Sequence, residues 1–122
     1  MKTFPITITL TQELKQQELE DILVAAFEGG INYWADKVEI VISPGKSDRP
    51  LNSPAEIIAA GGTANVDVEG KMHTLNWRKL LNGIRMHCED TRIDPISLME
   101  NHDADDADAI MQYALFNEII YC

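Results

Sequence analysis

The chain has 122 residues, 45% of them hydrophobic, which is enough for one domain with a single core. Its formal net charge of −10 argues against binding to duplex DNA or RNA through phosphates, because such binding requires a basic face. The charge leaves open a basic protein partner or mimicry of nucleic-acid charge. The sequence has no run of 18 apolar residues and no apolar signal-peptide block, so we expect a cytoplasmic protein without a membrane partner. Cys88 and Cys122 are then expected to be free thiols.

The first third of the chain predicts a strand, a helix and a second strand. Residues 4–10 alternate apolar and polar side chains, which is typical of a strand, and Thr11 can cap the helix that follows. That helix ends at the pair Gly29 and Gly30. Residues 38–42 alternate again and predict the second strand, and residues 43–50 predict an exposed loop. The core stripe of the helix consists of Leu19, Ile22, Leu23, Ala26 and Gly30.

The middle of the chain predicts a short helix, a hairpin and a long helix. The short helix begins at Pro54 with Ser53 as its cap, and the hairpin turns at Gly70 and Lys71. Asn76 or Thr74 caps the long helix. Its predicted apolar stripe consists of Trp77, Leu80, Leu81, Ile84 and Cys88, and the residues expected on its other faces are Arg78, Lys79, Arg85 and His87.

After a break at Asp94 and Pro95, a last helix is predicted from Asp103 onward, with Asn117 as a left-handed stop and residues 118–121 as a short strand. Its stripe consists of Ala107, Ile110, Met111 and Ala114. The pattern favours one compact α+β domain over residues 1–122, with three main helices packed on a small, mostly antiparallel sheet. The residues expected in the core are Leu23, Ala26, Trp77, Leu81, Ile84, Ile110 and Ala114.

Charge is distributed unevenly along the second half of the chain. Residues 93–122 hold seven acids and no Lys or Arg, whereas residues 71–92 hold five bases against Glu89 and Asp90. One interpretation is that two neighbouring elements neutralise each other. The other is a local cationic spot for a small anion within an acidic protein.

The sequence predicts no metal site, no cofactor and no enzymatic activity. The acidic segment 102–108 lacks the glycine and the final glutamate of an EF-hand loop, and acids at a helix start are explained by the helix dipole. The three histidines show no zinc-ligand spacing. Cys88 falls on an apolar stripe, which favours a buried, inert thiol.

The most informative segment runs from Glu28 to Trp34, with the sequence EGGINYW. Its glycines allow a positive φ or a close approach of the backbone, and Asn32, Tyr33 and Trp34 follow with an amide, a phenol and an indole. Adjacent residues in a turn cannot all face inward, so at least one of these three should face solvent. The segment suits the binding of a ligand or protein, and it equally suits plugging the end of a core.

Residues 25–34, 80–84 and 105–121 together resemble a family of small uncharacterised proteins encoded by bacteriophages and prophages. Relatives commonly carry Gly where Asn117 and Cys122 stand, and Asn tolerates the same left-handed backbone. The resemblance implies a phage origin and no particular chemistry. It singles out a second motif in the last helix, which includes Gln112 and Tyr113.

Two functions remain open. One is a non-enzymatic protein that inhibits a host factor, such as a defence component, by protein–protein contact in the host cytoplasm. The alternative is a small-molecule binder that sequesters a nucleotide-derived signal, with aromatic rings to stack a base and Arg78, Lys79 or Arg85 for phosphate. Either could act as a homo-oligomer. We expect the two motifs to meet in space and form one pocket or contact surface, unless the first is purely structural. The candidate binding residues are Glu28, Gly29, Gly30, Asn32, Tyr33, Trp34, Asp108, Gln112 and Tyr113.

Overall fold

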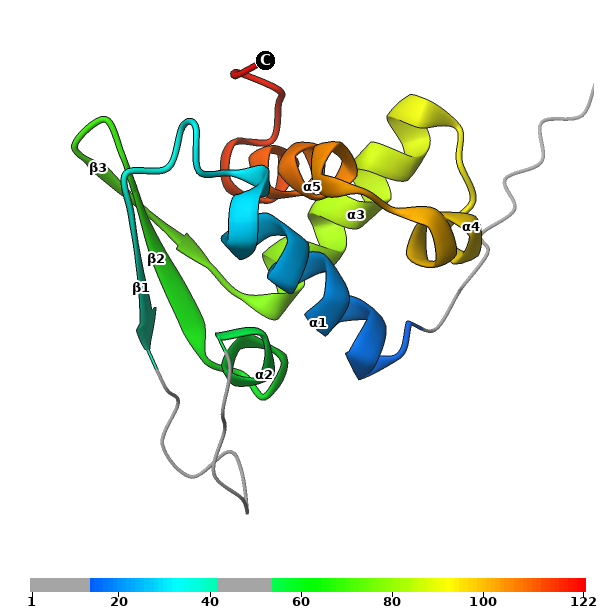
Figure 1. The fold of residues 1–122 in the computed structure, drawn as a ribbon, viewed down its shortest axis with the longest axis horizontal. Coiled ribbons are helices and arrows are strands. Elements are labelled where there is room, and N and C mark those ends of the chain that lie inside the picture. Colours follow the sequence, from blue (N-terminus) through cyan, green and yellow to red (C-terminus); the bar gives the residue numbers. More distant parts are fainter. Residues whose placement is uncertain (1–13, 42–53) are drawn as a thin grey trace, which may run out of the picture.

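The computed structural model describes residues 14–41 and 54–122, so the calls on residues 4–10, 43–50 and Ser53 lie outside the described residues. The described part has an α+β fold, as predicted, with helices to one side of an antiparallel sheet (Figure 1). In chain order the elements are α1 (Gln16–Ala25), the π-helical turn η1 (Ala26–Gly30), β1 (Lys37–Val41), α2 (Pro54–Ala59), β2 (Thr63–Val68), β3 (Lys71–Leu75), α3 (Trp77–Thr91), α4 (Pro95–Asn101) and α5 (Ala104–Phe116).

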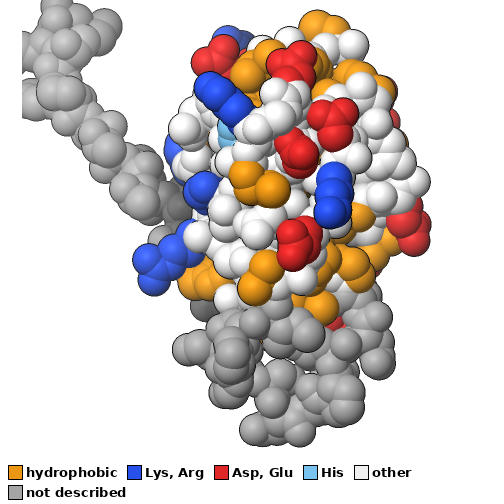
Figure 2. All heavy atoms as spheres, turned by 90° about the vertical axis from the view of Figure 1, so that its left-hand side faces the viewer, with side chains coloured by type: hydrophobic (Ala, Val, Ile, Leu, Met, Phe, Trp, Pro, Cys, Tyr) orange, Lys and Arg blue, Asp and Glu red, His pale blue; other side chains and the backbone are white. Residues whose placement is uncertain are grey.

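The three strands pair in the order β1-β2-β3. The β2–β3 hairpin turns at Glu69 and Gly70, which have φ values of 52° and 81°, so the turn lies one residue earlier than predicted. One face of β2 is buried against the helices through Ala64, Val66 and Val68. The opposite face of the sheet is exposed and carries charged and apolar side chains interspersed (Figure 2).

Helix α1 begins later than predicted. Lys15 is its N-cap residue, and the Lys15 backbone amide donates to the Glu18 carboxylate at 3.1 Å, whereas the prediction on Thr11 lies outside the described residues. The expected stripe is otherwise confirmed, with Leu19 half-buried and the rest buried through to Gly30 in η1.

Helices α3 and α5 pack against each other, and Gly83 sets their separation. A Cβ atom at Gly83 would lie 2.3 Å from the Ile110 carbonyl oxygen, so only a glycine allows this approach. The α5 stripe is confirmed, because all four of its predicted residues are buried. The α3 stripe is partly wrong, because Trp77 is 40% exposed and Leu81 is only half-buried, while His87 is buried instead of lying on an outer face. The contact at Gly83 centres the buried face of α3 on residues 80, 83, 84 and 87.

Two local predictions near the C-terminus are corrected. The break at Asp94 and Pro95 is the start of α4, because the Asp94 side chain accepts from the Ser97 amide and proline suits the first helical position. Residues 118–121 form no strand. Asn117 has φ of 60° and ends α5 as predicted, and Asn76, not Thr74, caps α3. None of the helices in the described ranges has the length and apolarity needed to cross a membrane.

Candidate functional site

The turn that follows η1 is held close to the start of α5 by Gly30. A Cβ atom at Gly30 would lie 3.0 Å from the Ala104 carbonyl oxygen and 3.2 Å from the Ala25 carbonyl oxygen. Gly29 has no such neighbour, since nothing lies within 4 Å of a Cβ built there. The close approach predicted for the glycine pair is therefore a property of Gly30 alone.

The side chains of this turn divide between the core and solvent. Ile31 is fully buried and Trp34 is 5% exposed, whereas Asn32 and Tyr33 face outward and Tyr33 is 55% exposed. The expectation that at least one of residues 32–34 faces solvent is confirmed. Glu28 is also exposed.

Asp108 joins the two sequence motifs. Its carboxylate accepts hydrogen bonds from the Tyr33 hydroxyl at 2.5 Å, the Trp34 indole Nε1 at 2.7 Å and the Gln112 amide at 3.0 Å. Partial burial and the hydrogen bond to Asp108 raise the pKa of Tyr33 to about 12, because a phenolate would face the carboxylate. The expected meeting of the two motifs is therefore observed.

Gln112, which is 1% exposed, fixes the C-terminal segment 118–122. Its Oε1 accepts from the backbone amides of Ile120 and Tyr121, both at 2.8 Å, and its Nε2 donates to the Tyr121 carbonyl oxygen at 2.9 Å. The Tyr121 ring stacks on Trp34, with centroids 5.7 Å apart and an interplanar angle of 5°. These bonds explain why the predicted terminal strand is wrong: the amides of the segment bond to a side chain and not to a neighbouring strand.

A hollow of about 440 Å³ lies where the turn, α5 and the C-terminal segment meet. Two carboxylates contribute to its lining, and among the described residues no Lys or Arg does. Beside it, Ile119 is 41% and Ile120 is 51% exposed. The hollow is lined by Tyr33, Asp105, Asp108, Ala109, Gln112, Ile119, Tyr121 and Cys122. We refer to Tyr33, Asp105, Asp108, Ile119 and Ile120 together as the Tyr33 surface.

Tyr113 does not join this network. Its ring lies toward α3, with its centroid 6.5 Å from that of His87. Burial and the nearby Asp90 raise the pKa of Tyr113. The structure thus places Tyr113 apart from the other candidate residues, since it is one position further around the helix than Gln112.

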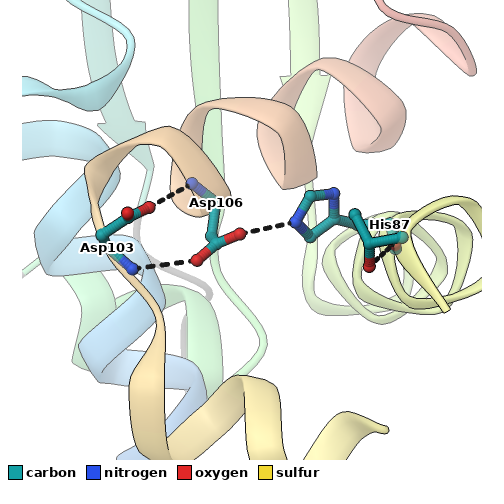
Figure 3. Close-up of polar contacts among 4 residues, drawn as sticks. His87, Asp103 and Asp106 are labelled. Atoms are coloured by element: carbon teal, nitrogen blue, oxygen red, sulfur yellow. Dashed lines mark hydrogen bonds and ion pairs between the residues drawn. The ribbon is translucent and has the colours of Figure 1, made fainter. Parts of the chain in front are cut away.

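The acidic start of α5 is largely accounted for by local bonds and one buried histidine (Figure 3). The Asp103 carboxylate accepts from the Asp106 backbone amide at 2.9 Å, and the Asp106 carboxylate accepts from the Asp103 backbone amide at 3.1 Å, which is a capping box. The second oxygen of Asp106 lies 2.8 Å from His87 Nε2. Burial acts to raise the pKa of Asp106, but the hydrogen bonds from His87 and the Asp103 amide lower it below its usual value. Sequence reasoning missed both the capping box and the contact between His87 and Asp106. An Asp three residues after Asp103 was a signal for the capping box, whereas the sequence held no such signal for the histidine contact.

The basic residues of α3 lie elsewhere. Arg85 pairs with Glu89 of its own helix at 2.8 Å, Arg78 lies over the Trp77 ring at 5.4 Å, and Lys79 donates to the Thr74 carbonyl. His87 of α3 lies 2.8 Å from Asp106 of α5, but it is not one of the five bases on which the neutralisation interpretation rests, so that interpretation stays a prediction. The lining of the hollow includes no part of the cationic spot considered above.

Within residues 14–41 and 54–122, no group of three or more His, Cys, Asp or Glu side chains is arranged to hold a metal ion. Both thiols are free, with Cys88 buried in α3 and Cys122 exposed. Comparisons of the chain with protein-family models, with curated proteins and with solved structures found no match.

Proposed function

We propose that this chain is a non-enzymatic binding protein that acts by protein–protein contact through the Tyr33 surface. The observation that carries the proposal is a set of exposed apolar side chains, Tyr33, Ile119 and Ile120, beside a hollow lined by two aspartates. Exposed aromatic and branched apolar side chains with a polar rim are typical of protein interfaces.

Rigidity supports this proposal. The hydroxyl of Tyr33 is fixed by Asp108, and the segment that carries Ile119 and Ile120 is fixed by the hydrogen bonds of Gln112. A surface that is ordered before it binds loses less conformational entropy on association. Gln112 is 1% exposed, whereas Tyr33 is 55% exposed and uses its hydroxyl in the bond to Asp108, so its ring remains available to a partner.

Charge indicates the chemistry of the partner. Asp105 and Asp108 contribute carboxylates to a lining that, among the described residues, includes no Lys or Arg, and the chain as a whole carries −10. Such a surface favours a partner with an apolar patch and a basic rim. The nucleotide alternative receives less support, because a phosphate in this hollow would face two carboxylates. With the resemblance to phage and prophage proteins, we propose a host factor, such as a defence component, as the partner in the host cytoplasm.

The test is capture of a partner from host lysate by the immobilised protein, followed by mass spectrometry. The double substitution Tyr33→Ala with Ile120→Asp should remove the captured protein, because it deletes the aromatic anchor and places a charge in the apolar contact. Capture should weaken as salt is raised, because the partner is basic.

Ile96→Asp is the matched control, since Ile96 is 54% exposed in α4, which lies apart from the C-terminal segment (Figure 1) and does not line the hollow. It should leave capture unchanged. Loss of capture in both variants, or in neither, would contradict the assignment of the Tyr33 surface. A bound nucleotide in native mass spectra, with no captured protein, would favour the alternative.

A further inference from the structure

A second hollow, unrelated to the Tyr33 surface, runs beside α3. It is a groove of about 1010 Å³, with Leu14 and Leu19 at the α1 side and Trp77, Leu81 and Ile84 along α3. Two of its charged residues, Arg85 and Glu89, pair with each other at 2.8 Å. Arg92 and Asp94 also contribute to the lining, and its other eight residues are apolar, so apolar side chains are the dominant chemical feature of the groove.

The groove is lined by the two residues of the predicted α3 stripe that are not buried in the core. Trp77 is 40% exposed and Leu81 is half-buried, and both line it. Ile93, just past the end of α3, is 41% exposed and lines it too. An open apolar groove of this kind is typical of a docking site for another segment of chain.

We propose that this groove is the docking site of the chain's own residues 4–10. Leu14 is the first described residue and belongs to the lining, so the chain that precedes it starts at the groove. Residues 4–10, with the sequence FPITITL, carry apolar side chains at positions 4, 6, 8 and 10 and no charge. An uncharged segment with one apolar face matches a groove whose lining is mainly apolar.

Length and linkage support the same occupant. An extended segment of seven residues spans about 23 Å. The 15 residues of α3 span about the same length, roughly 22 Å. Because only three residues join position 10 to Leu14, the segment is present at an effective concentration on the order of millimolar. It would therefore occupy the groove ahead of a free partner of similar intrinsic affinity.

Disulfide trapping in the full chain tests the proposal, because Cys88 lines the groove. In a Cys122→Ala background, Ile6→Cys and Ile8→Cys are compared with Thr7→Cys under mild oxidation. Oxidation is done near pH 9, because burial and nearby carboxylates raise the pKa of Cys88. At least one of the two Ile variants should form an intramolecular disulfide with Cys88 at least five times faster than Thr7→Cys, whose side chain alternates to the other face.

Equal rates for the Ile and Thr variants would overturn the proposal, and so would a disulfide that joins two chains, which would assign the groove to a second copy. A second measurement is acrylamide quenching of Trp77, since Trp34 is only 5% exposed. Replacing the isoleucines at 6 and 8 together by Asp should raise quenching at least twofold, whereas replacing the threonines at 7 and 9 by Asp should not. Equal quenching in the two double variants would also overturn the proposal.

Discussion

Gly83→Ala is the sharpest test of how α3 and α5 pack. The new Cβ would lie 2.3 Å from the Ile110 carbonyl oxygen and 3.0 Å from both the backbone nitrogen and the Cβ of Ala114. These are contacts with a helix backbone, which cannot turn aside as a flexible side chain can. The two helices must therefore separate by roughly 1 Å, given ordinary van der Waals contact distances near 3.5 Å.

The cost follows from the side chains that this interface buries. Leu80 and Ile84 on α3 and Ile110 on α5 belong to the same buried core, and each is at most 2% exposed. Burial of each such side chain contributes about 1.5–3 kcal/mol, and a gap of up to 1 Å forfeits a quarter to a half of the contact energy. For the three side chains together the loss is about 1–4.5 kcal/mol, with a middle value of about 3 kcal/mol, and the better helix propensity of Ala returns about 1 kcal/mol. We expect a net destabilisation of about 1–3 kcal/mol, in the usual range for overpacking.

Urea unfolding followed by far-UV circular dichroism measures this change as a lower midpoint at unchanged slope. Gly29→Ala is the control, because nothing lies within 4 Å of a Cβ there, and it should change the free energy of unfolding by less than about 0.5 kcal/mol. If Gly83→Ala is as stable as wild type, α3 and α5 do not pack through Gly83 and the reasoning fails.

Three further changes probe the site and the buried histidine. Gln112→Leu removes the acceptor of two C-terminal amides, so it should cost about 1–2 kcal/mol and speed amide exchange in residues 118–122; unchanged exchange would contradict the tether. The Tyr33 phenol should ionise near pH 12 when its ring carbons are followed by NMR, and Asp108→Asn should lower this pKa. Because the pKa is raised in the fold, the contribution of Tyr33 to stability is full below about pH 10 and declines as the pH rises toward 12. The pKa of Asp106 is lowered in the fold, so its contribution to stability is present above its usual pKa of about 4 and is lost as the pH falls further. Asp106→Asn should therefore weaken the fall in the free energy of unfolding below about pH 4. An unchanged pH dependence in this range would refute the argument.

Regular local patterns were the part of the fold that the sequence predicted well. The α5 stripe and its left-handed end at Asn117 follow from an unbroken helical period and a residue that tolerates positive φ. The hairpin follows from alternation on both sides of Gly70, although its turn lies one residue earlier than expected. These features depend on neighbours in sequence, so a single amino-acid sequence is enough to predict them.

Which face of α3 is buried could not be predicted in the same way. Apolar spacing gives Gly83 no weight, yet a Cβ atom there would lie 2.3 Å from the Ile110 carbonyl oxygen of α5. It also treats His87 as a surface residue, because its partner Asp106 is 19 positions away on another helix. Trp77 was assigned to the core because it begins the helical spacing of the apolar stripe, although it is 40% exposed. Leu81→Ala should accordingly cost less than the 2–5 kcal/mol typical of a buried leucine.

The candidate site shows the same division between local and distant information. Sequence reasoning placed polar groups on the turn and in the last helix, but it could not see that Gln112 holds backbone amides eight and nine residues later. It grouped Tyr113 with Gln112 because they are adjacent in sequence, whereas adjacent helix positions point about 100° apart. Asp105 was treated only as part of an acidic run, yet it lines the hollow.

The question of whether the EGGINYW segment is structural or functional is best answered residue by residue. Asp108 already accepts three hydrogen bonds, so it has little capacity left for a partner, and Trp34 is buried beneath Tyr121. Tyr33 differs from both, because its hydroxyl belongs to the network while more than half of the residue remains exposed. Tyr33→Phe should therefore lower stability and keep most of the binding, whereas Tyr33→Ala should lose binding as well. A Phe variant that fails to bind would mean that a partner reads the hydroxyl and not the ring.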